Sequence, residues 1–194
     1  FMTAVLNNGG GFYSAEHYIH EAKMCGALIE LPCINQSDHA NKVKGKTIYL
    51  GFGYLKNIEL LTIQRILTER QLFGDFLSLD NFMDRIAISI EQVTVLIRIN
   101  AFRDLKVPKT ALLWKATFKL NTTKTKQVQE QVKLFHSQHQ NFEIPQLNNH
   151  WLENVYDEIE LLGFTVHDYF SLVTDTFCPH IKAKEMPQFT NQNV

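Results

Sequence analysis

The sequence predicts a mainly α-helical protein with a small β ribbon near its N-terminal end. Apolar residues fall at helical spacing over most of the chain after Glu59, which is the pattern of helices with one buried face. Two short runs, 27–31 and 47–50, read instead as strands: the first ends at Pro32, and the second is β-branched and aromatic. With 194 residues and 45% hydrophobic content, the chain can bury one core, or one core and an annex.

Helix boundaries follow from capping residues and from the apolar period. Ser14 and Gly26 suit the two caps of the first predicted helix, and Pro108 suits the first position of a later one. The last predicted helix stops at Gly163. The expected helices are 15–25, 59–70, 79–86, 90–97, a helix starting at 108, and 152–162.

Two polar stretches predict an exposed connection late in the chain. Residues 121–126 are polar and favour helix caps, and residues 137–149 are rich in Gln, Asn and His and contain Pro145. They bracket a short apolar segment. Because this composition is typical of surface loops, we expect an exposed connector over 121–150.

Composition limits the class of protein. The sequence has no run of 18 apolar residues and does not open with a signal peptide, so no membrane span is expected and the cytoplasm is the expected compartment. The three cysteines, Cys25, Cys33 and Cys178, have no close spacing, which argues against a disulfide framework or a zinc site. Because the chain opens with Phe1 inside an apolar element, we expect a piece of a larger protein.

Charge is sorted along the chain, although the formal net charge is only -1. Residues 1–103 carry ten Lys/Arg and ten Asp/Glu, residues 104–150 carry seven and three, and residues 151–194 carry two and seven. A basic stretch beside an acidic one favours a nucleic-acid face next to a partner face, although moderate sorting also occurs in ordinary proteins.

The plan of helix, tight bend and helix occurs twice. A turn at Gly51 and Gly53 leads into the first bend at Asn57, and the second bend follows at Asn100. A reversal between helices needs a residue that tolerates positive φ, usually Gly and sometimes Asn. The helix after each bend has unpaired N–H groups and the positive end of its dipole, which together suit a phosphate. The alternative is an Asn-capped helix pair without a ligand.

Charged side chains beside the bends act in both directions. Lys56 at the first bend and Arg103 at the second add positive charge that favours a phosphate. Glu59 opposes it, because a carboxylate in the first turn satisfies the same amides that a phosphate would use.

Six short motifs carry a resemblance to a known family. They are FMTAVLN (1–7), EAKMCG (21–26), LPCINQS (31–37), IYLGFGYLK (48–56), GDFLSLDNF (74–82) and LIRINAF (96–102). Their order and spacing resemble the C-terminal fingers and tandem helix-hairpin-helix region of the bacterial replicative DNA polymerase III alpha subunit, a C-family DNA polymerase. ELLGF (160–164) resembles the motif that precedes that family's oligonucleotide-binding domain. The resemblance covers nearly the whole chain.

The resemblance implies a division of the chain into four parts. Residues 1–45 would be the C-terminal part of the fingers, and 46–120 a tandem helix-hairpin-helix DNA-binding module. Residues 121–150 would be the connector with a clamp-binding motif, and 151–194 a helix and tail leading toward the oligonucleotide-binding domain. The implied contacts to duplex DNA are independent of base sequence and come from Lys56, Asn57, Ile58, Asn100, Ala101 and Arg103.

Departures from the family pattern concern the bends. The family usually has Gly at the positions of Asn57, Glu59 and Asn100, which predicts weaker phosphate binding here. Asp is common at the positions of Cys33 and Arg103. Because Arg103 adds positive charge, the second bend is expected to be the better phosphate site.

Gln131, Leu134 and Phe135 occupy the place where the family carries its sliding-clamp motif. In such a motif Gln131 hydrogen-bonds the rim of a pocket on the clamp, and Leu134 and Phe135 bury their side chains in it. The alternative is that Leu134 and Phe135 pack against this domain's own core.

The sequence predicts no catalytic residue in this chain. In the resembled family the carboxylates that hold the metal ions for nucleotidyl transfer lie in an upstream palm domain. We therefore expect no cofactor in this fragment, Mg²⁺ in the parent polymerase, and no activity of the fragment alone.

Acidic and histidine pairs have structural explanations. Asp80 and Asp84 form a helical i, i+4 pair, and Asp157, Glu158 and Glu160 are placed in the first turns of a helix, where the dipole favours negative charge. No metal site is expected, because the histidine pairs have no recognisable third ligand. These pairs are His17 with His20 and His136 with His139.

These observations predict a fragment of a DNA-directed DNA polymerase that contacts duplex DNA and tethers the enzyme to its sliding clamp. Other replicase subunits are further expected partners, and a membrane is not. Two alternatives remain: a stand-alone helix-hairpin-helix module of the repair type, and a helical protein-interaction domain. The choice between a main replicase and an error-prone copy stays open.

Overall fold

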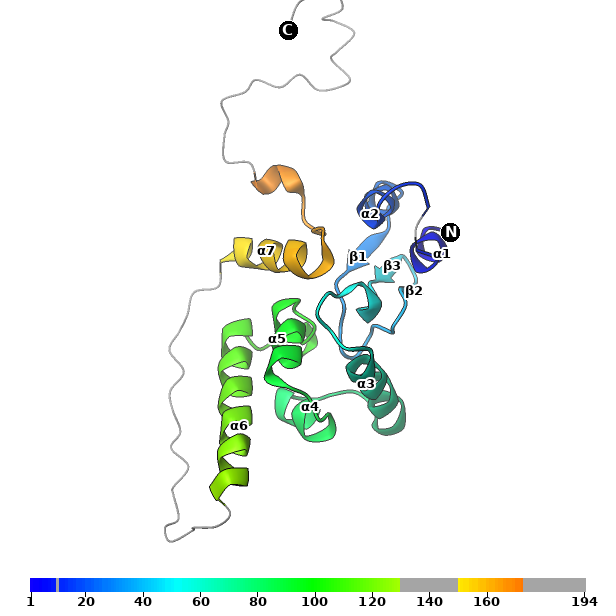
Figure 1. Ribbon diagram of the computed structural model, residues 1–194. Coiled ribbons are helices and arrows are strands. Elements are labelled where there is room, and N and C mark those ends of the chain that lie inside the picture. Colours follow the sequence, from blue (N-terminus) through cyan, green and yellow to red (C-terminus); the bar gives the residue numbers. More distant parts are fainter. Residues whose placement is uncertain (10, 130–149, 173–194) are drawn as a thin grey trace, which may run out of the picture.

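The computed structural model describes residues 1–9, 11–129 and 150–172 (Figure 1). Within these ranges the fold is mainly helical with one small sheet, as the sequence predicts. The α-helices are α1 (Met2–Asn7), α2 (Ala15–Met24), α3 (Leu60–Phe73), α4 (Leu79–Arg85), α5 (Ile90–Arg98), α6 (Lys109–Gln129) and α7 (Trp151–Leu162). The 3-10 helices are η1 (Phe52–Tyr54), η2 (Arg103–Leu105) and η3 (Tyr169–Leu172). No helix in the described ranges is long and apolar enough to cross a membrane.

The sheet has three strands in the order β1-β3-β2. The two predicted strands pair in parallel as β1 (Leu28–Glu30) and β3 (Thr47–Tyr49). The third strand, β2 (Lys42–Lys44), was not predicted and pairs antiparallel with β3. All three β2 residues are exposed, so β2 has no apolar face that a pattern search would detect.

Helices α2 and α7 end at the Gly residues that the sequence predicts. Gly26 has φ +86 just after α2, and Gly163 has φ +89 just after α7. Ser14 is the N-cap of α2, but its hydroxyl contacts His17 Nδ1 at 2.8 Å and makes no capping hydrogen bond. Gly74, with φ +76, ends α3 at Phe73, beyond the expected end near 70.

Three phenylalanines lie at the centre of the core. Phe76 and Phe102 each meet the ring of Phe82 edge-on, with centroids 5.0 Å apart. All three are at most 1% exposed. The core therefore joins the chain around α4 to the second bend, and the packing of α5 on α6 extends it toward the C-terminal half.

Helix α6 is longer than the sequence predicts. It continues to Gln129, so the expectation that residues 121–126 begin the connector is corrected. Residues 121–129 contain neither Gly nor Pro. Asn and Thr lower helix propensity by only about 0.5 kcal/mol each, which does not end a helix that is already formed.

Candidate nucleic-acid interface

The first bend lies between η1 and α3. Asn57 is in the left-handed region with φ +63, as the sequence predicts for a tight reversal. Lys56 and Asn57 are exposed, whereas Leu55 is only 6% exposed and anchors the bend in the core. Within the described residues the Lys56 ammonium has no ion-pair partner. The bend thus presents a cation and a fixed backbone turn to solvent.

Gln92 on α5 holds the first bend from behind. Its amide group donates to Asn57 O at 2.9 Å and accepts from Glu59 N at 2.8 Å, and its side chain is buried. The sequence analysis missed this residue. The available signal was a Gln three residues after Ser89, because Ser-x-x-Gln is a capping-box pattern and Ser89 does cap α5 by accepting from Gln92 N.

The start of α3 is less blocked than the sequence predicts. Glu59 is the N-cap residue, but its side chain makes no capping hydrogen bond, so it does not occupy the first amides of the helix. This corrects the expectation that its carboxylate satisfies them. Leu60 and Leu61, in the first turn, are 57% and 53% exposed.

The second bend has the predicted backbone but is buried. Asn100 has φ +61, which matches Asn57. Ala101, however, is 0% exposed, its N–H donates to Leu96 O at 2.9 Å, and its carbonyl accepts from Ile34 N at 3.0 Å. The three-residue η2 follows in place of a regular helix. Ala101 therefore has neither a side chain nor an amide available to DNA, contrary to its predicted role.

Arg103 faces the protein. Its guanidinium donates to Leu31 O at 2.8 Å and Pro32 O at 3.0 Å, and lies 3.3 Å from the Glu30 carboxylate. These contacts join the second bend to the end of β1. They correct the expectation that Arg103 supplies free charge for a phosphate, because its donors are already used within the fold.

Cys33 packs behind the same bend. Its thiol is 3.1 Å from Asp104 Oδ2, and the residue is 0% exposed. Burial, and then the hydrogen bond to Asp104, raise the pKa of this thiol. The thiol thus stays protonated and serves as a packing residue.

The C-terminal end of helix α7 packs beside the first bend. Leu161 O accepts from Lys56 N at 2.8 Å, and the rings of Phe164 and Tyr54 meet edge-on with centroids 6.4 Å apart. A Cβ on Gly163 would lie 3.3 Å from Lys56 Nζ, which places the ammonium at the negative end of the α7 dipole. The motif at 160–164 is therefore a docking element for the bend.

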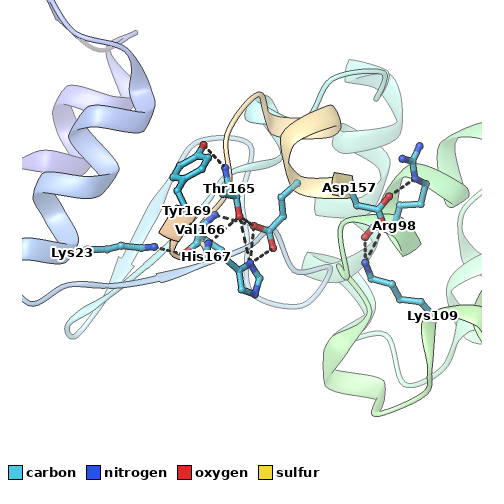
Figure 2. A network of polar contacts seen from close by, with 9 residues as sticks. Lys23, Arg98, Lys109, Asp157, Thr165, Val166, His167 and Tyr169 are labelled. Atoms are coloured by element: carbon cyan, nitrogen blue, oxygen red, sulfur yellow. Dashed lines mark hydrogen bonds and ion pairs between the residues drawn. The ribbon is translucent and has the colours of Figure 1, made fainter. Parts of the chain in front are cut away.

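Ion pairs hold α7 against α5 and α6. Arg98 and Lys109 both point at Asp157, with Arg98 Nε 2.8 Å and Lys109 Nζ 3.2 Å from its carboxylate oxygens (Figure 2). Arg98 also pairs with Glu160. Glu160 in turn raises the pKa of Arg98, and Arg98 lowers the pKa of Glu160.

A buried carboxylate organises the turn after α7. Glu158, 1% exposed, accepts from Thr165 Oγ1 at 2.6 Å and from Val166 N at 2.9 Å, and lies near His167. Lys23 reaches from α2 to Val166 O in the same network (Figure 2). Burial lowers the pKa of Lys23. This network fastens the C-terminal turn to the N-terminal helices.

The acidic residues have structural roles, as predicted, but one reason is corrected. Asp80 pairs with Lys115, and Asp84 lies 2.5 Å from Lys119, which ties α4 to α6. The Asp157 group lies in the last turns of α7, where the dipole is unfavourable to negative charge. Arg98 and Lys109, together with the hydrogen bonds to Glu158, compensate for that position.

A hollow of about 760 Å³ lies between α2 and the turn after α7. Aromatic residues, among them Tyr18 and Tyr169, line it. Its three carboxylates, Glu16, Glu21 and Asp168, outnumber its one lysine, Lys23, which disfavours a phosphate backbone. We therefore place the candidate interface at the first bend, away from this hollow.

Several predicted residues fall outside the described ranges. They are the clamp-motif residues Gln131, Leu134 and Phe135, the pair His136 and His139, and Cys178. Among the residues that the structure does describe, no group of three or more His, Cys, Asp or Glu could hold a metal ion.

Comparison with known proteins finds a family model that matches the region containing both bends. Residues 26–112 match the model of the helix-hairpin-helix motif. The error-prone DNA polymerase of Mycobacterium tuberculosis (strain ATCC 25618 / H37Rv) is 29% identical over 108 residues, which is 55% of this chain and 10% of that protein. The DNA polymerase III subunit alpha of Thermus aquaticus is 35% identical over 69 residues, 36% of this chain and 6% of that protein.

The chain thus spans about a tenth of the length of the error-prone polymerases that it matches. The error-prone DNA polymerase of Mycolicibacterium paratuberculosis (strain ATCC BAA-968 / K-10) matches over the same length at 29% identity. These findings support a helix-hairpin-helix region related to segments of DNA polymerases.

Proposed function

We propose that this chain is the duplex-binding segment of a DNA-directed DNA polymerase and contacts the phosphate backbone mainly through its first bend. The observation that carries the proposal is the exposed pair Lys56 and Asn57, held by Gln92 within a region that matches the helix-hairpin-helix motif. The α3 amides not blocked by Glu59 add donors for a phosphate oxygen. Ile58 is half-buried beside these amides, and the proposal retains it as a residue that contacts DNA.

The interaction is independent of base sequence and sensitive to salt. Lysine and backbone amides bind phosphate oxygens, which are the same at every base pair. Neutralising a phosphate releases counterions, so affinity falls as salt rises. Asn100 contributes indirectly, by shaping the second bend at the end of α5. Gln92 on α5 in turn holds the first bend.

A pair of substitutions at Asn57 tests this proposal. Asn57→Gly keeps the left-handed backbone, whereas Asn57→Val makes it unfavourable because β-branched side chains clash there. We expect Asn57→Gly to bind a 20-base-pair duplex within about twofold of wild type, and Asn57→Val to bind roughly tenfold more weakly, in proportion to the strain. Fluorescence anisotropy at 50 mM salt on two unrelated sequences measures both. Equal binding by the two variants, or no wild-type binding at that salt, contradicts the proposal.

We further propose that the parent protein carries out template-directed nucleotidyl transfer and that Gln131, Leu134 and Phe135 tether it to a sliding clamp. The similarity to polymerase segments supports the first part, and the place of the motif between α6 and α7 supports the second. Mg²⁺ would be the cofactor of that parent, held by carboxylates of its palm. The boundaries at 45 and 150 of the four-part division remain part of this proposal, and the boundary at 120 moves to the end of α6 at Gln129.

Two measurements test these parts separately. The double variant Leu134→Ala/Phe135→Ala should lose clamp binding in surface plasmon resonance while keeping duplex affinity; equal clamp binding by variant and wild type removes the tether. Reading the parent open reading frame tests the enzyme. An upstream palm with paired aspartates supports it, and a reading frame without one supports a stand-alone DNA-binding module.

A further inference from the structure

The hairpin of β2 and β3 carries a cluster of lysines that neither bend uses. Lys42, Lys44 and Lys46 stand within five residues, and all are exposed. Gly45, with φ +63, opens a two-residue turn between the strands, so the hairpin is tight and its tip is fixed. β2 is also at the edge of the sheet, with its outer side open to solvent.

The strand register places hydrogen-bond donors together on one face. Lys42 is opposite Tyr49, and Lys44 is opposite Thr47. Side chains directly opposite each other project to the same face, so two ammonium groups and two hydroxyls form one patch. Lysine ammonium and Thr or Tyr hydroxyl groups are typical ligands of DNA phosphate oxygens.

The lysines in and beside the turn keep their charge available to a ligand. Lys42 lies 3.2 Å from Asp38, which partly neutralises it. Lys44 and Lys46 make no ion pair within the described residues. Glu30 lies in the same row of the sheet as Lys42, two strands away. Its carboxylate is paired with Arg103, so it is already neutralised.

The hairpin is continuous with the proposed DNA site. β3 ends at Tyr49, and the chain passes through η1 to Lys56. The backbone of residues 39–40 packs directly against Gly51, where a Cβ would lie 2.3 Å from His39 O. The hairpin and the first bend are therefore joined by a tightly packed segment, and their positions relative to each other are restrained.

We propose that the β2–β3 hairpin is a second phosphate-binding element that contacts duplex DNA through Lys44 and Lys46. This inference rests on the proposed function of the first bend and extends it to a second site. Two separated contacts on one duplex lengthen the footprint and fix the direction in which DNA crosses the domain.

The salt dependence of duplex binding tests the hairpin. Each lost phosphate contact lowers the slope of log affinity against log salt by about 1. We expect slopes lower by about 1 for Lys44→Gln or Lys46→Gln and by about 2 for the double variant. Lys115→Gln, which removes the same formal charge from a lysine paired with Asp80, is the matched control and should keep the wild-type slope.

The possible results separate this inference from the proposed function. If the wild type does not bind duplex at 50 mM salt, the proposed function fails and the hairpin site fails with it. If Lys56→Gln lowers the slope and the hairpin double variant does not, only the hairpin site is overturned. A different result would be self-association of the double variant in size-exclusion chromatography while its salt slope of duplex binding stays unchanged. That result would show that the lysines protect the edge strand from pairing, and it would also overturn the site.

Discussion

The two bends have the same backbone and different surroundings. Asn57 and Asn100 have φ values of +63 and +61, yet the residue beside Asn57 is an exposed lysine, and the residue after Asn100 is a fully buried alanine. The charged residue of the second bend, Arg103, bonds to the carbonyls of Leu31 and Pro32. A repeated local motif has therefore been divided between an exposed site and a structural joint.

The difference shows that a charge near a bend is not sufficient evidence for a phosphate site. The sequence analysis ranked the second bend higher because of Arg103, and the contacts of Arg103 reverse that order. A guanidinium with several carbonyl acceptors within reach satisfies its donors inside the protein. A lysine whose neighbours are solvent and a helix C-terminus keeps its charge accessible.

The largest expected effect is on the stability of the second bend. Phe102→Ala removes a fully buried ring that packs on Phe82, which should lower the free energy of unfolding by about 3–5 kcal/mol. At the first bend, Leu61→Ala truncates a side chain that is 53% exposed and should cost about 0.5 kcal/mol. Urea denaturation measures both. Similar losses at the two bends would contradict the division between joint and exposed site.

Gln92 tests whether the second helix pair supports the first bend. Gln92→Leu leaves Asn57 O and Glu59 N without their partner and should lower stability by about 1–2 kcal/mol. It should also speed hydrogen exchange at the Glu59 amide. Gln64→Leu, an exposed position on α3, is the control and should leave that exchange rate unchanged. An unchanged rate in Gln92→Leu would show that the bend holds its shape without α5.

Substitutions of Lys56 and Arg103 should separate the effect on DNA binding from the effect on stability. Lys56→Gln should lower the salt slope of duplex binding by about 1 and leave the unfolding midpoint nearly unchanged. Arg103→Gln should lower stability by about 1.5–3 kcal/mol, because charged hydrogen bonds are lost, and keep the slope. The interpretation is wrong if folded Arg103→Gln loses slope and Lys56→Gln does not.

The smallest expected effect concerns the ion pair that holds α7 near the first bend. Arg98 lowers the pKa of Glu160, so the pair stabilises the fold above the ordinary carboxyl range and loses this contribution as pH falls through the lowered pKa. Glu160→Gln should therefore melt slightly below wild type at pH 7, and the difference should vanish in acid. Because Glu160 is exposed, 0.5 M NaCl should also reduce the difference. A difference that persists at pH 2 would contradict the assignment.

Local chemistry was sufficient to predict helices α2 to α7 and the positions of both bends. Asn and Gly are needed where φ is positive, and Gly26 and Gly163 mark helix ends by the same local rules. The sequence analysis missed α1, β2, the extension of α6 to Gln129 and the role of Gln92. β2 is stabilised by its pairing with β3, and Gln92 by partners more than 30 residues away, neither of which is visible in a local pattern.

The same distinction between local rules and long-range contacts applies to the candidate site. The order of residues alone established that two left-handed Asn positions would each reverse the chain, because that requirement belongs to a single residue and its neighbours. Only the tertiary structure decided which bend meets solvent. Ile34 binds the Ala101 carbonyl and Pro32 binds the Arg103 side chain, and both contacts join segments that are far apart in the sequence. Exposure is a property of the packed fold, so charge and motif could place the bends but could not rank them.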